Sequence, residues 1–368
     1  MRLQLTLAAV ALAAPPVLAV DTTADTRVNV YTDEELTVFN HGGVAALETE
    51  EGLRANGHYG VDVISGATRS YTPDVVTTAT RVDETRLEGG VGAGGVLLPG
   101  LRLDGGYLTS KEPDFWSHRA NVTAEAELFE RRGTLTVSGV LGVLSVGRAG
   151  DPAYSEGEGQ VGVDVSYAHA LGRATSVKAL ASVGHSLCEE QRGCGASPYR
   201  YVPVALHDGG PTIALAERHP AMHTSGALAA RLSQNIQSGV AVHGGYRLYL
   251  DSWGVVGHTA DAAVARSFFG ERLTLRLDTR AYLQGPAAFS GSYAVDGGAV
   301  PGFRTADRRL GAMHDVIAGG SGARDLPSIG PARVRVQLRV ARAWFRYHDA
   351  VIAARDAWIV GLGVGASL

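Results

Sequence analysis

The sequence predicts an all-β protein: a transmembrane antiparallel up-and-down β-barrel of about 16 strands, with 14 strands as the nearest alternative. Three observations lead to this fold class. Apolar and polar residues alternate in segments of about ten residues. The links between these segments are short and long in turn. No apolar run long enough for a membrane-spanning helix follows residue 20.

The stretch Arg272–Gln284 shows the alternation most plainly. Its odd-numbered positions from 273 to 283 hold four leucines, a threonine and an alanine, whereas its even-numbered positions are polar or charged. Because side chains alternate across a strand, this stretch predicts one apolar and one polar face. Such a strand fits a soluble sandwich or a membrane barrel with lipid outside and water inside.

The order of the links favours the barrel. Short links alternate with long, Pro- and Gly-rich ones, as periplasmic turns and extracellular loops do in outer-membrane barrels. One link breaks this order, because 319–331 is long where a short turn is expected. The short links are 49–52, 97–100, 129–133, 170–174, 233–238 and 268–271, and the long ones are 63–84, 110–117, 147–158, 188–222 and 285–307.

Sixteen alternating segments are the candidate strands. Phenylalanines lie near the short turns, and Tyr59, Tyr107, Trp253, Trp344 and Trp358 lie toward the loops, which predicts two aromatic girdles. The candidate strands are 27–32, 36–48, 53–62, 85–96, 101–109, 118–128, 134–146, 159–169, 175–187, 223–232, 239–250, 258–267, 272–284, 308–318, 333–347 and 355–368.

The N-terminus has the pattern of a secretory signal. Arg2 supplies positive charge, Leu5–Ala14 is a short apolar core, and Val17–Ala19 is a small-residue cleavage site. An N-terminal membrane helix is the rival interpretation, but the apolar core ends at Pro15. We therefore expect a signal peptide over 1–19 and a single barrel domain over 20–368.

The two cysteines, Cys188 and Cys194, lie close together in a polar segment. Export through an oxidising compartment predicts a loop disulfide between them. The alternative, half of a metal site, lacks further ligands at a zinc spacing. The net charge of -4 comes without a basic stripe, so no nucleic-acid partner is expected.

Several stretches of the chain resemble an uncharacterised family of Gram-negative outer-membrane β-barrel proteins, a domain of unknown function. The clearest is Tyr59–Thr68, in which Asp62, Ser65, Gly66, Ala67 and Thr68 carry the family-like loop motif. The resemblance implies an outer-membrane barrel and brings no activity or ligand. The C-terminal Leu368 departs from the aromatic residue that usually ends such barrels. The other similar stretches are 112–118, 147–152, 196–200, 251–254 and 284–289.

If the leucines of the barrel strands face lipid, the alternate positions face the lumen. Charge at mid-bilayer on the lipid face costs roughly 2 to 4 kcal/mol for Arg or Lys, which sets the register. These positions predict a polar pore with a basic wall and an acidic patch, or charges that only pair and stiffen the barrel. The lumen-facing candidates are Arg54, His58, Glu125, Glu127, His243, Arg247, Arg276, Asp278, Arg280, Arg333, Arg335 and Arg339.

Arg342 and Arg346 flank Trp344 on the outward face, where they would hold lipopolysaccharide phosphates or be solvated. Ser117 and His118 are adjacent on a strand, so they point to opposite faces and cannot act together in catalysis. We therefore expect no catalytic residues.

We expect no metal site and no cofactor. His219 and His223 lie in a Pro-broken segment that does not suit metal ligation. The acidic residues around the first long loop lack a regular calcium spacing; these residues are Asp62, Asp74, Asp83 and Glu84.

The expected function is porin-like passive diffusion of small polar or anionic solutes, with loops 188–222 and 285–307 as candidate constrictions. The alternative is a closed structural or surface-interaction barrel that acts through its extracellular loops. An outer-membrane enzyme is the third possibility, but no Ser, His and carboxylate converge. Expected partners are outer-membrane lipid and lipopolysaccharide, and the barrel-assembly machinery and periplasmic chaperones during biogenesis; the oligomeric state is open.

Overall fold

The computed structural model describes residues 20–33, 36–68, 71–72, 75–76, 80–148, 150–205, 212–237, 239–291, 293–294, 302–348 and 353–368. The expected signal peptide over 1–19 lies outside these residues. Among the described residues, no helix is long and apolar enough to cross a membrane.

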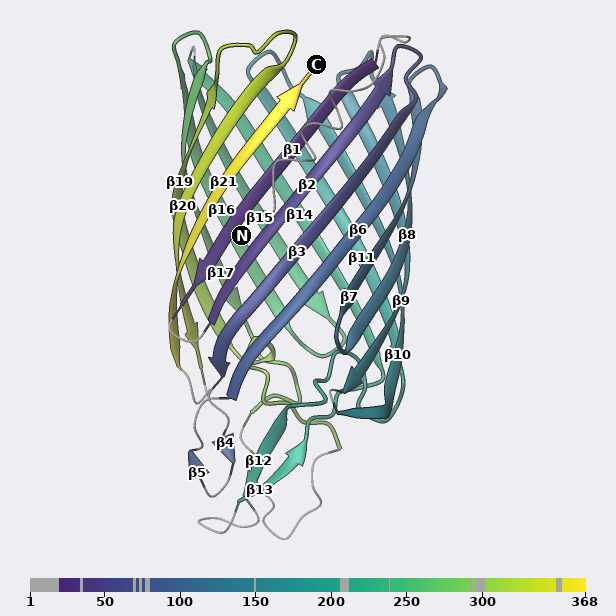
Figure 1. Cartoon of the computed structure of the whole chain (residues 1–368), viewed down its shortest axis with the longest axis vertical. Helices are drawn as coiled ribbons and strands as arrows, with labels where there is room; N and C mark the ends of the chain where they lie inside the picture. The colour runs from purple at the N-terminus through teal and green to yellow at the C-terminus, as the bar shows by residue number, and fades with distance from the viewer. Residues whose placement is uncertain are drawn as a thin grey trace.

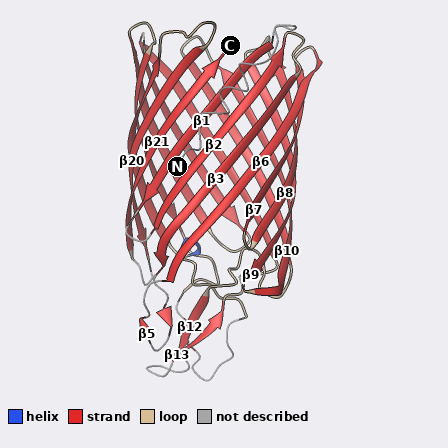
Figure 2. Ribbon diagram, in the orientation of Figure 1, coloured by secondary structure: helices blue, strands red, loops and turns tan. Residues whose placement is uncertain are grey.

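Sixteen strands form one closed barrel, in which each strand pairs with its neighbours along the chain (Figures 1 and 2). Every pairing in the barrel is antiparallel, and β1 closes the barrel by pairing with β21 over ten residue pairs. The predicted fold class and strand number are therefore confirmed. The strands are β1 (Val20–Thr32), β2 (Leu36–Thr49), β3 (Arg54–Thr68), β6 (Thr80–Leu98), β7 (Leu101–Glu112), β8 (Phe115–Leu128), β9 (Gly133–Arg148), β10 (Asp151–Ala170), β11 (Thr175–Cys188), β14 (Met222–Gln237), β15 (Val240–Asp251), β16 (Val256–Phe268), β17 (Leu273–Gln284), β19 (Met313–Asp325), β20 (Arg333–Tyr347) and β21 (Ala354–Ser367).

The outer face of the barrel is apolar. Leu275 and Leu277 of β17 are 47% and 66% exposed, and Val91 of β6 is 65% exposed, although large apolar side chains of a water-soluble protein gather in its core. Across the strands, the register places these outward residues in one continuous belt. A closed barrel with an apolar outer belt spans a membrane, which places this protein in the outer membrane.

Aromatic side chains mark both edges of the belt. Phe129 and Phe269 are exposed at short turns, and Tyr107, Trp116 and Trp358 are exposed toward the opposite end. These positions are those of membrane-interface girdles. Trp253 was predicted for the girdle as well, but that assignment is wrong, because its ring is buried among the loops.

Two links predicted to be long are only two residues in length. β7 and β8 are separated by 113–114 only, and β9 and β10 by 149–150. The polar segments before and after these turns continue the ladder, because their backbone groups pair across strands whether or not an apolar face is present. The strict alternation of short and long links therefore does not hold at one end of the barrel.

The predicted strand 308–318 begins too early. Residues Arg308–Leu310 form a short 3-10 turn, η2, and β19 continues to Asp325 through a glycine-rich stretch that the sequence predicts as a loop. Gly319 suits the strand, since a Cβ there would lie 2.6 Å from the Cβ of Ala341 on β20. The link from β19 to β20 is consequently short, as in the rest of that end.

The two ends of the barrel differ. Val20, where β1 begins, and Ser367, where β21 ends, lie at the end with the short turns, and the three long links lie at the other end (Figure 1). Those links contain a hairpin of β4 (Tyr71–Thr72) and β5 (Val75–Val76), and a small sheet of β12 (Tyr201–Ala205), β13 (Thr212–Ala216) and β18 (Tyr293–Ala294). We assign the long-loop end to the cell exterior, because outer-membrane barrels have short periplasmic turns.

Candidate functional site

The inner face of the barrel carries most of the charged strand residues. Side chains paired across neighbouring strands point the same way, so the inner face can be followed around the barrel from strand to strand. The register puts all twelve predicted lumen candidates on this face, opposite the exposed leucines and valines. They fall into two groups on different walls.

The basic group lies on β17 and β20. Asp278 accepts two hydrogen bonds from the guanidinium of Arg339, at 2.9 and 2.8 Å, and lies 3.8 Å from Arg276. Arg335 pairs with Asp325 at 3.5 Å. Arginines therefore outnumber carboxylates along this wall, and part of its positive charge is not matched by a pair.

Arg280 of this wall and Arg247 of the nearby β15 stand out among the inner arginines. Each guanidinium lies over a tyrosine ring of its own strand, 5.8 Å from the ring of Tyr249 and 5.7 Å from the ring of Tyr282, respectively. In the part of the chain that the structure describes, neither arginine forms an ion pair with a carboxylate. Two guanidiniums held against aromatic faces with free donors suit the binding of anionic groups.

The acidic group lies on the wall formed by β6 to β10. Its inner positions hold ten carboxylates against four guanidiniums, and they include the predicted Glu125 and Glu127. The carboxylates are Glu84, Glu88, Asp104, Glu112, Glu125, Glu127, Asp151, Glu156, Glu158 and Asp164, and the guanidiniums are Arg86, Arg102, Arg119 and Arg148.

Arg54 is not part of a free basic surface. It reaches over Gly94 to form a two-pronged pair with Asp104, and the Nε to Oδ1 distance is 2.5 Å. Gly94 leaves room for this pair, since a Cβ there would lie 1.9 Å from Oδ1 of Asp104. Arg102 pairs with Glu48 in the same region.

The two histidines among the lumen candidates lie on different walls. Nε2 of His58 is 4.0 Å from Glu88, and Nδ1 of His243 is 2.8 Å from the hydroxyl of Ser233. For Arg333, the structure shows no ion pair among the described residues.

The strand order places the two walls opposite each other. In the closed ring of sixteen strands, β8 is eight positions from β19, and β7 is eight positions from β17. The inner faces of β17, β19 and β20 hold five arginines against three aspartates, whereas the opposite wall is acidic. An electric field therefore runs across the barrel axis, from the basic to the acidic wall.

Two long loops meet at the long-loop end of the barrel and form a cap. We use "cap" for the described residues within 189–221 and 285–312; the sequence predicts two separate constrictions, in loops 188–222 and 285–307. A strand from each, β12 and β18, pair in one sheet, and Arg218 and Arg304 form a further bridge between the two loops. The two loops thus form one structure.

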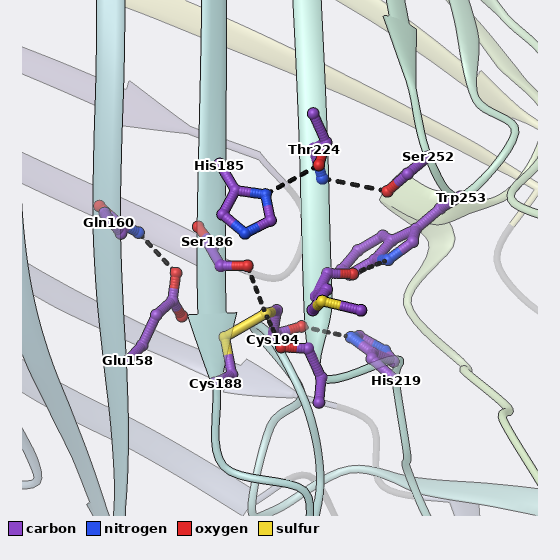
Figure 3. The surroundings of a disulfide bond; sticks show 12 residues. Glu158, Gln160, His185, Ser186, Cys188, Cys194, His219, Thr224, Ser252 and Trp253 are labelled. Atoms are coloured by element: carbon purple, nitrogen blue, oxygen red, sulfur yellow. Dashed lines mark hydrogen bonds between the residues drawn. A yellow bond between two sulfur atoms is a disulfide. The ribbon is translucent and has the colours of Figure 1, made fainter.

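A small apolar core holds the cap to the barrel wall. Cys188, the last residue of β11, forms a disulfide with Cys194, which confirms the predicted bond (Figure 3). Cys194 packs with Trp253, Val255 and Ala287 from the other links at this end. The indole of Trp253 donates to the carbonyl of Met222 at 3.1 Å.

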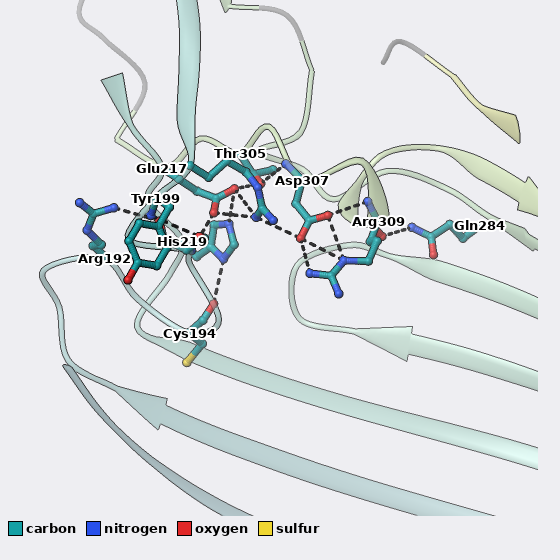
Figure 4. Close-up of polar contacts among 11 residues, drawn as sticks. Arg192, Cys194, Tyr199, Glu217, His219, Gln284, Thr305, Asp307 and Arg309 are labelled. Atoms are coloured by element: carbon teal, nitrogen blue, oxygen red, sulfur yellow. Dashed lines mark hydrogen bonds and ion pairs between the residues drawn. The ribbon is translucent and has the colours of Figure 1, made fainter. Parts of the chain in front are cut away.

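A buried polar network forms the second part of the cap (Figure 4). Glu217 is fully buried, and its carboxylate accepts hydrogen bonds from Arg200 at 2.9 Å, from the hydroxyl of Thr305 at 2.5 Å and from the Ser197 amide at 2.9 Å. His219 lies 3.4 Å away. Thr305 belongs to the other loop, so Glu217 ties the two loops together.

Asp307 extends the network. It accepts from Arg309 at 2.8 Å and lies 3.1 Å from Arg200. Burial favours a higher pKa for Asp307, but the hydrogen bond from Arg309 and the positive charge of Arg200 outweigh it and lower the pKa to about 2. Burial acts in the same sense on Glu217, whose pKa is nevertheless lowered by His219, Arg200 and Thr305.

Sequence reasoning missed this network. Glu217, Thr305 and Asp307 lie in loops without periodicity, and 88 residues separate Glu217 from Thr305. The sequence carried no signal for it, because charged residues are about as frequent in the two longest links as in the whole chain. His219 was considered as a metal ligand, but its Nδ1 lies 2.8 Å from the carbonyl of Cys194.

The other residues singled out in the sequence are dispersed. Asp62 accepts from Asn40 at 2.5 Å inside the barrel, and Ser65 to Thr68 continue β3 instead of leaving it. Ser117 is buried on the inner face, whereas His118 faces outward and bonds to Tyr107. His223 pairs with Asp251 at 3.1 Å. Asp74 lies outside the described residues.

Comparison with known proteins adds a family of unknown function. The family described as "Protein of unknown function (DUF3570)" matches residues 163–323, from within β10 to within β19. The resemblance to an uncharacterised family is thereby confirmed over this range, which includes the stretches at 196–200, 251–254 and 284–289. No curated protein matches the chain.

Several solved structures from Pseudomonas aeruginosa are similar at low identity. OccK2 (OpdF) is 10% identical, with 95% of this chain and 98% of that chain covered and a TM-score of 0.48. OprD is 10% identical over 95% and 96%, with a TM-score of 0.47. The outer membrane protein opdK is 11% identical over 95% and 99%, with a TM-score of 0.45. None of these similarities extends to a particular solute.

Proposed function

We propose that the protein is a porin-like channel for passive diffusion of small polar or anionic solutes. The observation that supports this function best is the pair of oppositely charged walls on the inner face of a sixteen-strand barrel. A barrel of this strand number has an interior wider than its own side chains fill. Charged walls that face each other across water would orient a passing dipolar solute.

Arg247 and Arg280 give this channel a preference for anions. Their guanidiniums form no ion pair with a carboxylate among the described residues, so they would be open to an anionic solute. The paired residues, such as Arg339 with Asp278, hold the wall in shape. In this proposal the inward charges therefore divide into a structural set and a solute-contacting set.

The cap would set the size limit of the channel. Its two loops are joined by buried hydrogen bonds and a disulfide, so its position over the mouth is fixed by packing. Loops that fold over a barrel mouth narrow the path for solutes. We propose no catalysis, because Ser117 and His118 face opposite sides of the wall.

A closed barrel that acts through its loops is the second candidate function. The rigid cap supports it, since a small sheet and an apolar core at the exterior end could present a recognition surface without transport. In both cases we propose export by a signal peptide over 1–19. Insertion would use periplasmic chaperones and the barrel-assembly machinery.

Single-channel conductance in planar bilayers separates the two functions. Purified protein whose gel migration shifts on heating is folded, and such protein should give steady conductance steps with anions favoured over cations. Arg247→Gln with Arg280→Gln should lower the anion preference, whereas Arg54→Gln, which removes a paired arginine, serves as the control. If folded wild-type protein gives no conductance, the proposed channel function is wrong and the closed barrel is favoured.

A further inference from the structure

A cluster of arginine and tryptophan lies on the lipid-facing side of the barrel at its exterior edge. On β20 the outward residues are apolar up to Val340, and Arg342, Trp344 and Arg346 follow in alternate positions. Trp358 on β21 is the register partner of Arg342. The change from apolar to cationic side chains marks the level at which hydrocarbon gives way to lipid headgroups.

The two tryptophans hold Arg342 in place. Its guanidinium carbon is 5.5 Å from the ring of Trp344 and 5.4 Å from the ring of Trp358. Stacking of this kind fixes the plane of the guanidinium, which reduces the entropy lost when a ligand binds. The cluster is therefore an ordered surface feature.

One carboxylate serves both arginines. Asp356 accepts from Nη2 of Arg342 at 3.3 Å and from Nη1 of Arg346 at 2.9 Å. Two guanidiniums carry ten N–H donors between them, so most of the donors are not used by Asp356. The cluster has a net positive charge, and both arginine side chains are 42% exposed.

Two histidines border the same surface. His314 is the register partner of Arg346, and its Nδ1 is 3.2 Å from Nε2 of His348. Around the rest of this rim, the outward positions whose side chains the structure describes hold no second pair of arginines. On the opposite rim, Arg266 and Arg324 are also outward.

We propose that Arg342 and Arg346, with Trp344 and Trp358 beside them, bind the phosphorylated headgroup of an outer-leaflet lipid. The geometry favours this ligand for three reasons. The site faces lipid, it lies at headgroup level, and guanidinium donors match phosphate oxygens. The tryptophan rings would contact the upper part of the acyl chains. This site is separate from the lumen and does not depend on the proposed channel.

The test is binding of the full-length folded protein to lipid A in detergent micelles, with lipid A that carries its phosphates and with dephosphorylated lipid A. The wild-type protein should bind the phosphorylated form at least about tenfold more tightly, as charge-assisted hydrogen bonds predict. Arg342→Gln with Arg346→Gln should abolish this difference. Arg266→Gln with Arg324→Gln removes two outward arginines from the other rim and should leave it unchanged.

Two further measurements keep the outcome clear. Asp356→Asn removes the competing carboxylate and should strengthen binding of phosphorylated lipid A, provided that its heat-modifiable migration shows a folded barrel. Inorganic phosphate at millimolar concentration should not displace the lipid, because the site also needs acyl contact. The proposal is overturned if both double variants lose binding equally, if dephosphorylated lipid A binds as well as lipid A, or if free phosphate competes.

Discussion

At the scale of single residues, the turn between β8 and β9 contains backbone conformations that L-amino acids rarely adopt. Phe129, Glu130 and Arg131 have φ values of 54°, 54° and 68°. A left-handed conformation costs a non-glycine residue roughly 1 to 2 kcal/mol. Glu127 and Arg131 pair across the turn at 2.9 Å, and Phe129 lies in the aromatic girdle, but an exposed pair of this kind offsets only a small part of the cost.

We therefore expect Glu130→Gly to raise the free energy of unfolding by up to about 1 kcal/mol, because glycine adopts this φ without steric cost. Urea titration of the folded protein in detergent measures the effect. Glu50→Gly is the matched control, since Glu50 lies in a short turn without a positive φ, and it should not stabilise the barrel. Equal effects of the two substitutions would contradict the explanation.

The sequence does not predict which charged side chains pair with one another. Alternation decides the face on which Arg54 or Asp278 lies, because the period of a strand is two. It does not decide contacts, which depend on register across strands. Arg54 pairs with Asp104 two strands away, and Asp278 pairs with Arg339, 61 residues later. The division of the lumen arginines into paired and unpaired sets therefore needed the structure.

At the scale of elements, glycines within strands make room for such pairs. Gly94→Ala should break the Arg54–Asp104 pair and lower the free energy of unfolding by about 1 kcal/mol or more, because a part-buried polar contact is lost and a steric overlap is created. Urea titration with intrinsic tryptophan fluorescence measures this. Gly139→Ala is the control, since a Cβ at Gly139 meets no atom within 4 Å. If Gly139→Ala lowers the free energy of unfolding as much as Gly94→Ala does, the effect does not come from loss of the Arg54–Asp104 pair.

The cap should depend on pH through Asp307. Its pKa of about 2 lies below the ordinary 3.8, so the carboxylate contributes stability that is fully present above about pH 4 and is lost as pH falls through 2. The difference corresponds to about 2 kcal/mol. Pepsin cleavage of the cap, corrected for the activity of pepsin on an unfolded substrate, should rise steeply from pH 4 to pH 2.

Asp307→Asn should make the cap sensitive to pepsin already at pH 4, since the pair with Arg309 is then absent. Asp325→Asn removes an exposed pair at the short-turn end and should leave cap cleavage unchanged. A cleavage profile of Asp307→Asn that matches the wild type would show that the cap is held without this carboxylate.

The strands show why elements were predicted better than their ends. Apolar residues alternate with polar ones only where one face of a strand contacts lipid. The alternation therefore identified sixteen strands, but it did not show where each strand ends beyond the membrane. β10 runs for 20 residues, of which only the part from 159 to 169 alternates clearly. Backbone pairing continues beyond that part and leaves no pattern in hydrophobicity. The polar network of the cap could not be predicted for the same reason, because it lies outside the alternating segments.

At the scale of the whole molecule, the opposed walls predict how selectivity can be changed. Arg247→Glu with Arg280→Glu reverses two charges on the basic side and should shift the ratio of anion to cation permeability several-fold toward cations. The shift should shrink at 1 M salt, where the screening length is about 3 Å. Reversal potentials under a salt gradient measure the ratio. An unchanged ratio at low salt would mean that these arginines do not line the solute path.

The pairing of β1 with β21 has a consequence for how the barrel is made. Thr23 pairs with Ser367, so the last ladder to form joins residues that are almost the entire chain apart. All other neighbouring strands of the barrel are consecutive along the chain apart from short loop strands, so their contacts are local by comparison. A seam of such high contact order closes late and at a large entropic cost. Until then, the unpaired backbone groups of β1 and β21 can pair with other chains, so both edges must be protected during assembly. We expect a substitution in this pair of strands to slow assembly more than a substitution elsewhere in the barrel wall.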